Sequence, residues 1–183
     1  IYPGCGGGAS SANCKMLLRY EYLRGQFHPL ALLPGKRTDS GLAVELPPLV
    51  KANELLLFDK GFFKLQSLLD IDQKKAFFLT PMNRTAHLWV SNAEGVTLQL
   101  DLADALSHTQ ENVVEWSSAL LGSESTTLPV RVVAFRLSEQ SASRHRAGLR
   151  RAYVKKGRLP PATALELAGW LILITNAPAD KLP

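Results

Sequence analysis

The spacing of apolar and polar residues near the start of this chain predicts a β-hairpin. Apolar and polar residues alternate over 15–23, which is typical of a strand with one buried face. A second apolar segment follows at 27–33, after the short turn Arg24-Gly25-Gln26. Pro29 has no backbone N–H, so it favours an edge position or a bulge in this second strand. We therefore expect the two segments to pair as antiparallel strands.

Uninterrupted apolar runs predict short strands buried on both faces at 55–58, 76–80 and 169–175. Between the first two runs, apolar residues recur at helical spacing over 62–74. Strand, helix and strand in this order form a βαβ unit, whose crossover is expected to be right-handed. We expect this unit and the preceding hairpin to lie in one mixed sheet, with the helix packed on it.

Beyond residue 84 the pattern becomes richer in strands. Alternating segments at 87–90 and 96–100 flank the polar turn Asn92-Ala93-Glu94-Gly95, which is a hairpin signature. Residues 128–137 form the clearest predicted strand of this part. The predicted fold class is therefore α/β, with a β-rich portion following the mixed sheet.

A basic helix is predicted over 139–157, with Gly157 as its C-terminal cap. The net charge of the chain is +5, and seven basic but no acidic residues gather within 144–158. Such a helix suits a polyanionic partner, although a merely solvated helix face fits the same pattern. The residues expected to contact phosphate share one face at helical spacing: Arg144, Arg151, Lys155 and Arg158.

Length and composition are those of an ordinary globular domain. The chain has 183 residues, of which 46% are apolar and 20% charged, so disorder is not expected. No apolar run approaches the roughly 18 residues that a membrane helix needs, so we expect a soluble protein with no membrane partner. The chain begins with Ile1, and no signal-peptide pattern follows, which suggests an internal piece of a longer polypeptide.

The cysteine and glycine patterns argue against two kinds of site. Cys5, Cys14 and four dispersed histidines are too few and too scattered for zinc, and they predict free thiols in a reducing cytosol. Residues 4–9 loosely match the dinucleotide-binding pattern G-x-G-x-x-A, but a strand rather than a helix follows them. A glycine-rich loop leading into a strand is therefore the better interpretation.

Asp59 is the first candidate for a catalytic residue. It follows the apolar run 55–58 directly, and Gly61 comes two positions later. Carboxylates are rarely buried unless they are paired or bind a metal, and open α/β sheets keep their sites at the ends of strands. A strand that delivers Asp59 to such an edge would place it in a site. The alternative is that Asp59 simply caps the helix that follows.

Three segments together resemble the insertion-sequence DDE transposases, in particular the hairpin-forming group of bacterial cut-and-paste elements. They are 3–10 with Leu18-Arg19-Tyr20, 57–63 around Asp59, and 131–178 with its basic helix and final strand. The match covers most of the chain in the family's order. Pro81 is a departure, since the family often carries an Arg there, and Arg84 is the candidate to replace it.

The resemblance implies a ribonuclease-H-like core in which three carboxylates hold two divalent metal ions, Mg²⁺ or Mn²⁺, for phosphoryl transfer. Asp59 matches the second carboxylate. The family's first Asp precedes the glycine-rich loop and its Glu follows Pro178 on a helix, so we expect both outside this chain. The core would then be partial, without its first strand and last helix. The isolated chain is expected to be inactive.

On this resemblance, residues 1–84 form a partial ribonuclease-H-like catalytic core, and 85–183 form an inserted β-rich subdomain with the basic helix. Trp170 matches the indole on which a flipped DNA base stacks during hairpin formation, although a core aromatic is the alternative. The implied partners are transposon-end and target DNA and a second copy in a homodimer. The implied location is the bacterial cytoplasm, in association with the nucleoid.

Two other hypotheses stay open at this point. One is a folded, non-catalytic DNA-binding remnant of a transposase. The other is a different ribonuclease-H-like nuclease, which would lack the β-rich insertion. The flanking reading frame would separate them, because a complete transposase needs an upstream Asp on a strand and a downstream Glu on a helix.

Overall fold

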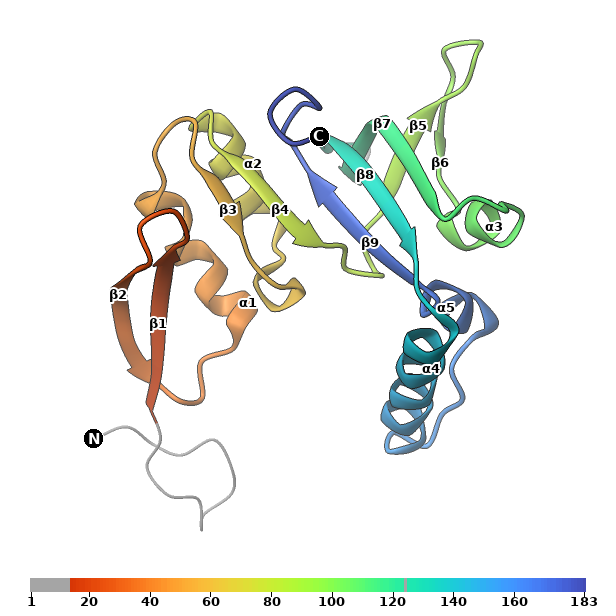
Figure 1. Ribbon diagram of the computed structural model, residues 1–183, viewed down its shortest axis with the longest axis horizontal. Coiled ribbons are helices and arrows are strands. Elements are labelled where there is room, and N and C mark those ends of the chain that lie inside the picture. The colour runs from red at the N-terminus through yellow and green to blue at the C-terminus, as the bar shows by residue number, and fades with distance from the viewer. Residues whose placement is uncertain (1–13, 124) are drawn as a thin grey trace.

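The computed structural model describes residues 14–123 and 125–183, which form a two-stranded and a seven-stranded sheet with short helices (Figure 1). Turns of 3₁₀ helix are labelled η. In chain order the elements are β1 (Cys14–Glu21), β2 (Gln26–Pro34), α1 (Asp39–Leu42), η1 (Ala43–Glu45), η2 (Pro47–Leu49), β3 (Leu55–Leu57), η3 (Lys60–Phe62), α2 (Leu65–Gln73), β4 (Phe77–Pro81), β5 (Leu88–Ser91), β6 (Thr97–Gln99), α3 (Leu102–Ser107), β7 (Val113–Ser123), β8 (Thr126–Arg136), α4 (Glu139–Val154), α5 (Ala162–Leu167) and β9 (Trp170–Thr175).

The seven-stranded sheet is mixed and has the order β3-β4-β9-β8-β7-β5-β6. β3 and β4 run parallel and are joined through α2, as the predicted βαβ unit requires, and the other neighbouring pairs are antiparallel. The predicted α/β class with a mixed sheet is confirmed. The predicted hairpin at 87–100 is also confirmed as β5 and β6. Its turn is closed by Asn92 Oδ1, which accepts hydrogen bonds from the backbone N–H groups of Glu94 and Val96.

The hairpin of β1 and β2 forms a sheet of its own, so the prediction that it shares a sheet with β3 and β4 is wrong. Among the described residues, β1 pairs only with β2, and β3 pairs only with β4. The periodicity of a strand defines its two faces but not its neighbour in the sheet, which explains the misassignment. The bulge expected near Pro29 is present, as a shift of register between Leu17 and Leu18 on the partner strand.

Side chains, rather than a strand ladder, connect the two sheets near Glu54. Arg19 of β1 donates from Nη1 to Leu49 O at 3.0 Å and from Nη2 to Glu54 Oε1 at 3.1 Å. Burial acts to raise the pKa of the Glu54 carboxyl, but the Lys51 N–H hydrogen bond and the Arg19 guanidinium outweigh it and hold the pKa below its ordinary value. The pair is therefore ionised at neutral pH.

The core lies on one face of the seven-stranded sheet. Leu68 and Ile71 of α2 have no exposed surface and belong to one cluster with Phe78 of β4, Val132 of β8 and Ile174 of β9. α3 and α5 extend this layer through Leu102 and Leu167. Helical spacing thus buries one stripe of each helix against one face of the sheet.

The opposite face of the sheet is not covered in the same way. Leu55 and Leu57 of β3 are 41% and 65% exposed, and Leu171 of β9 is 39% exposed. The prediction that the apolar runs of β3 and β9 are buried on both faces is therefore wrong, because side chains on this second face are exposed.

β4 and β9 are neighbours, with Leu79 opposite Thr175. The predicted portions 1–84 and 85–183 therefore contribute to one sheet, and their division into separate domains stays a prediction. In the part of the chain that the structure describes, no helix has the length and apolar character needed to cross a bilayer.

Candidate active site and nucleic-acid interface

One end of the seven-stranded sheet brings together residues that are far apart in the sequence. β3 and β4 are parallel, so their C-terminal ends meet there, and β9 runs antiparallel to β4 and begins there. β8 ends at the same place, with Arg136 opposite Trp170. We call this end the Asp59 edge, because Asp59 follows β3 there. Only β4 separates β3 from β9, which corresponds to about 10 Å at the usual strand spacing.

Asp59 is exposed at this edge and caps a turn. Its side-chain Oδ1 accepts a hydrogen bond from the Gly61 N–H at 2.6 Å, at the start of η3. Asp59 therefore caps the 3₁₀ turn η3, but it does not cap the helix α2, which begins at Leu65. Asp59 Oδ2 accepts no hydrogen bond within 14–123 and 125–183, so one carboxylate oxygen is available to a ligand.

Gly61 stands between two carboxylates. A Cβ at this position would lie 2.8 Å from Asp59 Oδ1 and 3.2 Å from Asp39 Oδ2. Asp39 is in turn held by Lys15 of β1, whose Nζ lies 2.7 Å from Asp39 Oδ1. No spacing rule in the sequence links Asp39 to Asp59, so the sequence did not identify this neighbour. A side chain at position 61 would press on both carboxylates, so the Asp59 carboxylate would have to turn to make room for it.

The donor set at this edge fits part of a magnesium site. Mg²⁺ prefers hard oxygen ligands in octahedral geometry and keeps several waters, so the free oxygen of Asp59 can supply one position. Asp39 adds a second carboxylate close by. Within the described residues there is no group of three or more His, Cys, Asp or Glu side chains placed to hold a metal. Further ligands for two ions would therefore come from outside these residues.

The predicted basic helix is present as α4, which starts three residues after β8 and extends beyond the Asp59 edge (Figure 1). It ends at Val154 rather than at Gly157. Gly157 does terminate it, with φ +65° and an Arg158 N–H to Tyr153 O hydrogen bond of 3.1 Å. Arg158 follows this turn, so the prediction that it shares a helix face with the other three basic residues is wrong.

The basic side chains proposed to contact phosphate are nonetheless free and exposed. None of them has a carboxylate within 4.0 Å in the described part of the chain, whereas Arg146 on the same helix is paired with Glu139 at 3.3 Å. An unpaired basic helix raises the positive potential beside the Asp59 edge. The unpaired exposed residues are Arg144, Arg151, Lys155 and Arg158.

Trp170 is buried, with 5% of its surface exposed, and packs with Leu106 and Ala134. Its ring is covered by the guanidinium of Arg136, whose Cζ lies 4.4 Å from the ring centroid. Arg136 is itself exposed and donates from Nη2 to Thr109 O at 2.7 Å. The indole is thus part of the core, and the exposed Arg136 side chain covers one face of its ring. The sequence did not identify this role of Arg136.

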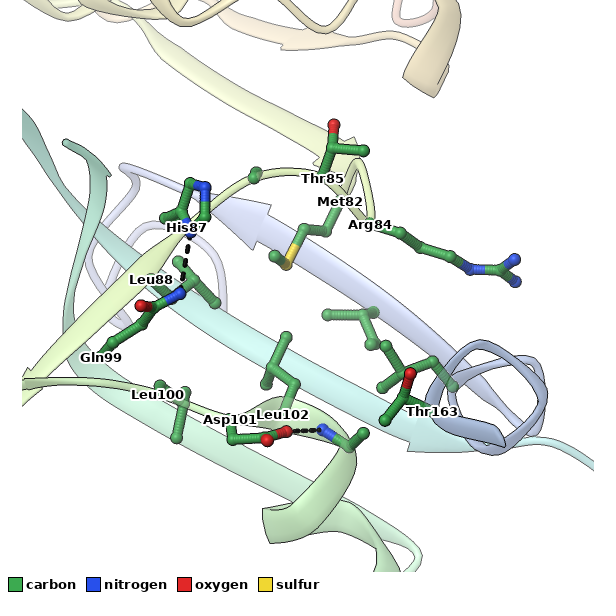
Figure 2. Close-up of a pocket in the computed structure, with 14 residues that line it drawn as sticks. Met82, Arg84, Thr85, His87, Leu88, Gln99, Leu100, Asp101, Leu102 and Thr163 are labelled. Atoms are coloured by element: carbon green, nitrogen blue, oxygen red, sulfur yellow. Dashed lines mark hydrogen bonds between the residues drawn. The ribbon is translucent and has the colours of Figure 1, made fainter. Parts of the chain in front are cut away.

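A cavity of about 510 Å³ opens beside the end of β4, on the core side of the sheet (Figure 2). Its floor is apolar, with Met82, Leu102 and Ile172, and Arg84 lies on its rim. Figure 2 shows the hydrogen-bonded pair His87 and Gln99 at one end of the cavity and Arg84 with Thr163 toward the other. Arg84 is exposed and follows the end of β4 by three residues, and whether it replaces the family's Arg at position 81 stays open.

Comparison with known proteins identifies relatives of the whole chain. It is 26% identical over 196 aligned residues to the transposase for insertion sequence element IS231B of Bacillus thuringiensis subsp. berliner, and 25% identical to that for IS231F of B. thuringiensis subsp. israelensis. Each alignment covers 100% of this chain and 41% of the relative. The transposase for IS1151 of Clostridium perfringens is 29% identical over 91 residues, which cover 50% of this chain and 19% of the relative.

No family model matches the chain. No solved structure matches it either. The chain spans about two fifths of the length of the transposases that it matches from end to end. The resemblance found in the sequence is therefore confirmed: over its whole length, this chain is homologous to the transposases of bacterial insertion sequences.

Proposed function

We propose that this chain is a portion of a DDE transposase, which cleaves DNA and transfers strands in a metal-dependent reaction. In this portion Asp59 is one of the metal-binding carboxylates, and α4 holds the DNA backbone. The observation that supports this most is the strand register, because it brings Asp59, Arg84, Trp170 and the start of α4 to one end of the sheet in a homologue of transposases.

A ribonuclease-H-like core is consistent with the strands on either side of Asp59. β3, α2 and β4 form a parallel βαβ unit, and an antiparallel hairpin precedes them. β1 and β3 each have one edge without a strand partner in the described part of the chain. A strand between them, from the longer polypeptide, would join the two sheets into one and bring the first catalytic Asp beside Asp59.

The chemistry assigned to this edge is in-line phosphoryl transfer. Two divalent ions, when bound, supply an activated nucleophile and neutralise the leaving oxygen. Asp59 would contribute its free carboxylate oxygen to that site as a metal ligand. The Gly61 N–H, which donates to the other oxygen, holds the carboxylate in one orientation. Lys15 neutralises the neighbouring Asp39, so the repulsion between the two carboxylates is reduced.

DNA contacts are assigned to two parts of the same edge. The unpaired side chains Arg144, Arg151, Lys155 and Arg158 would bind phosphate without regard to base sequence. Trp170 would stack on an extruded base once Arg136 has moved onto a phosphate, since stacking is worth about 1–3 kcal/mol per base. We further propose that the complete protein acts as a homodimer on DNA in the bacterial cytoplasm, associated with the nucleoid.

The decisive experiment replaces Asp59 in the complete protein. Asp59→Asn keeps the size of the side chain and its hydrogen bond to Gly61 but removes the charge, so we expect DNA cleavage to be lost and DNA binding to be retained. The control is Asp70→Asn on α2, whose carboxylate accepts a hydrogen bond only from Gln66 among the described residues. Cleavage by Asp59→Asn at the rate of Asp70→Asn would contradict the proposal. A wild-type protein that binds DNA but does not cleave it would be the inert remnant.

A further inference from the structure

One face of β1 carries polar contacts that join the first hairpin to the rest of the chain. Successive side chains of a strand point to opposite faces, so Lys15, Leu17 and Arg19 share one face of β1. Leu17 is 7% exposed, and the basic side chains on either side of it both reach acceptors outside the hairpin. Arg19 binds Glu54 just before β3, whereas Lys15 binds at the start of α1. The hairpin is therefore held at two separate points.

Lys15 makes two hydrogen bonds at the start of α1. Its Nζ donates to Asp39 Oδ1 at 2.7 Å and to Arg37 O at 2.9 Å. The side chains of Lys15 and Asp39 are 33% and 45% exposed, so both are partly withdrawn from water. The two acceptors fix the position of the ammonium group, and the charge-assisted bond in turn fixes the direction of the Asp39 carboxylate.

The Asp39 side chain closely approaches the turn that holds Asp59, which we call the Asp59 turn and define as residues 59–62. α1 lies beside η3 (Figure 1). A Cβ built on Gly61 would lie 3.2 Å from both Cβ and Oδ2 of Asp39, which is tighter than ordinary van der Waals contact. The N–H of the same glycine donates to Asp59 Oδ1 at 2.6 Å. Asp39 therefore occupies the space beside the residue that orients Asp59.

The first half of the Asp59 turn has few fixed points among the described residues. Asp59 and Lys60 are exposed, and the last hydrogen bond to β4 before them comes from the Phe58 N–H, at 3.4 Å. α1, in contrast, is anchored in the protein, because Leu42 at its end has no exposed surface. Asp39, at the other end of α1, thus presents a fixed side chain to a weakly held turn.

The charge of Lys15 allows a second carboxylate to lie this close to Asp59. Two unpaired carboxylates at such a distance repel each other, and the ammonium group neutralises one of them. Loss of Lys15 alone would leave a free carboxylate beside the Asp59 turn, and loss of the Asp39 charge alone would leave a free ammonium group there. Because either change breaks the same pair, their effects are expected to be non-additive.

We propose that the Lys15–Asp39 ion pair is a positioning clamp for Asp59. It fixes the Asp59 turn from the side of the hairpin, and with it the direction of the free Asp59 oxygen, without binding the metal ion itself. This inference rests on the proposed function, because a fixed direction matters for catalysis only if Asp59 is a metal ligand. Replacing groups that orient a metal ligand from outside typically costs about 10–100-fold in metal affinity or activity.

DNA cleavage by the complete protein over a series of Mg²⁺ concentrations tests the clamp. Lys15→Met and Asp39→Asn should each lower the rate at limiting Mg²⁺ by at least about tenfold and raise the Mg²⁺ concentration that gives half the maximal rate. The double variant should differ from the single variants by less than about threefold. Lys15→Arg keeps the charge and should retain more activity than Lys15→Met.

The matched control is the neighbouring ion pair of Arg37 and Glu45. Its atoms lie 3.6 Å apart, and its side chains are 41% and 47% exposed, which is close to the exposure of the clamp. Neither side chain is among the nearest neighbours of a Cβ at position 61. Arg37→Met and Glu45→Gln should therefore cleave DNA within about twofold of the wild-type rate, since exposed ion pairs contribute little.

Hydrogen exchange of the peptide 58–64, measured by mass spectrometry on the same complete proteins, needs no cleavage. The Gly61 N–H is hydrogen-bonded to Asp59, so its exchange reports on the order of the Asp59 turn. In the clamp variants we expect this peptide to exchange about tenfold faster than in the control variants, with an unchanged melting temperature.

Three results would overturn the proposal. Exchange and cleavage like those of the controls would mean that the pair is an ordinary surface ion pair. Faster exchange throughout the protein with a lower melting temperature would mean that it only supports the fold. A complete loss of cleavage in Asp39→Asn, with Lys15→Met like the controls, would make Asp39 a metal ligand. Faster exchange of 58–64 in a protein whose wild type does not cleave DNA would support the clamp and contradict the proposed function.

Discussion

Asp59 and Trp170 lie at the same end of one sheet but are presented to solvent in opposite ways. Asp59 is exposed on a 3₁₀ turn with one carboxylate oxygen free, whereas Trp170 is 5% exposed and lies under the Arg136 guanidinium. A ligand could reach Asp59 without any change in the fold, whereas a base that stacked on the covered face of the indole would first have to displace Arg136. Substitutions at Trp170 are therefore expected to change packing first, whereas substitutions at Asp59 test the proposed chemistry with little change in packing.

The largest effect is expected for Trp170→Ala. Truncating a buried Trp leaves a cavity and costs about 3–5 kcal/mol, so the free energy of unfolding in urea should fall by that amount. Val154→Ala, at a 64% exposed position of α4, is the control and should change it by less than about 0.5 kcal/mol.

DNA assays on Trp170→Ala would sharpen the comparison. If hairpin formation falls more than nicking at equal folded fraction, Trp170 also stacks on a base. If all steps fall together with stability, Trp170 acts only in the core.

The next effect concerns the basic residues beside the two sites. Replacing the four exposed basic residues that are proposed to contact phosphate with Ala should flatten the salt dependence of DNA binding by the complete protein. The slope of log K against log salt should become shallower by about 3–4, because each phosphate contact contributes about 0.9. The loss should be the same for any DNA sequence. The substituted residues are Arg144, Arg151, Lys155 and Arg158.

The matched control removes the same charge from elsewhere, at exposed positions away from α4: Arg24, Lys51, Lys74 and Lys181. Filter binding or fluorescence anisotropy at several salt concentrations gives the slopes. If the α4 variant kept the wild-type slope, its basic face would be merely solvated.

A smaller effect is expected for Gly61→Ala, which tests the geometry of the exposed site. The new Cβ would lie 2.8 Å from Asp59 Oδ1 and force the carboxylate to turn. Misplacement of a catalytic group by about 1 Å can cost about 100-fold in rate, so cleavage should fall by that order while the melting temperature changes little. Gly148→Ala is the control, since a Cβ there meets nothing within 4 Å. Cleavage by Gly61→Ala at the rate of the control would show that the orientation of Asp59 is not critical.

The smallest effect is on the pH dependence of stability. The pKa of Glu54 is lowered in the folded chain, so its contribution is present above its unfolded value, near 4.5, and is lost as the pH falls through the lower folded value. Glu54→Gln should lower the free energy of unfolding at pH 7 by less than about 1 kcal/mol, and the difference from wild type should vanish at acidic pH. Denaturation curves at a series of pH values measure this. A difference that grows toward low pH would contradict the sign.

The sequence by itself determined the local elements. Alternation predicted the β1–β2 and β5–β6 hairpins, and continuous apolar runs predicted β3, β4 and β9. The position of Asp59 just after a strand, and of Gly157 at a helix end, also followed from residues within one or two turns of chain. These features depend on backbone preferences and side-chain periodicity over short stretches, which a single sequence contains.

Only the tertiary structure decided which strands are neighbours and which faces are covered. Leu79 lies beside both Leu57 and Thr175, and no periodicity indicates a pairing across nearly 100 residues. The close approach of Asp39 to position 61 and the contact of Arg136 with Trp170 arise in the same way. An apolar run indicates that a strand prefers burial, but contacts with other segments decide whether each face is buried. The two faces of β3, β4 and β9 therefore differ in exposure although their residues are almost equally apolar.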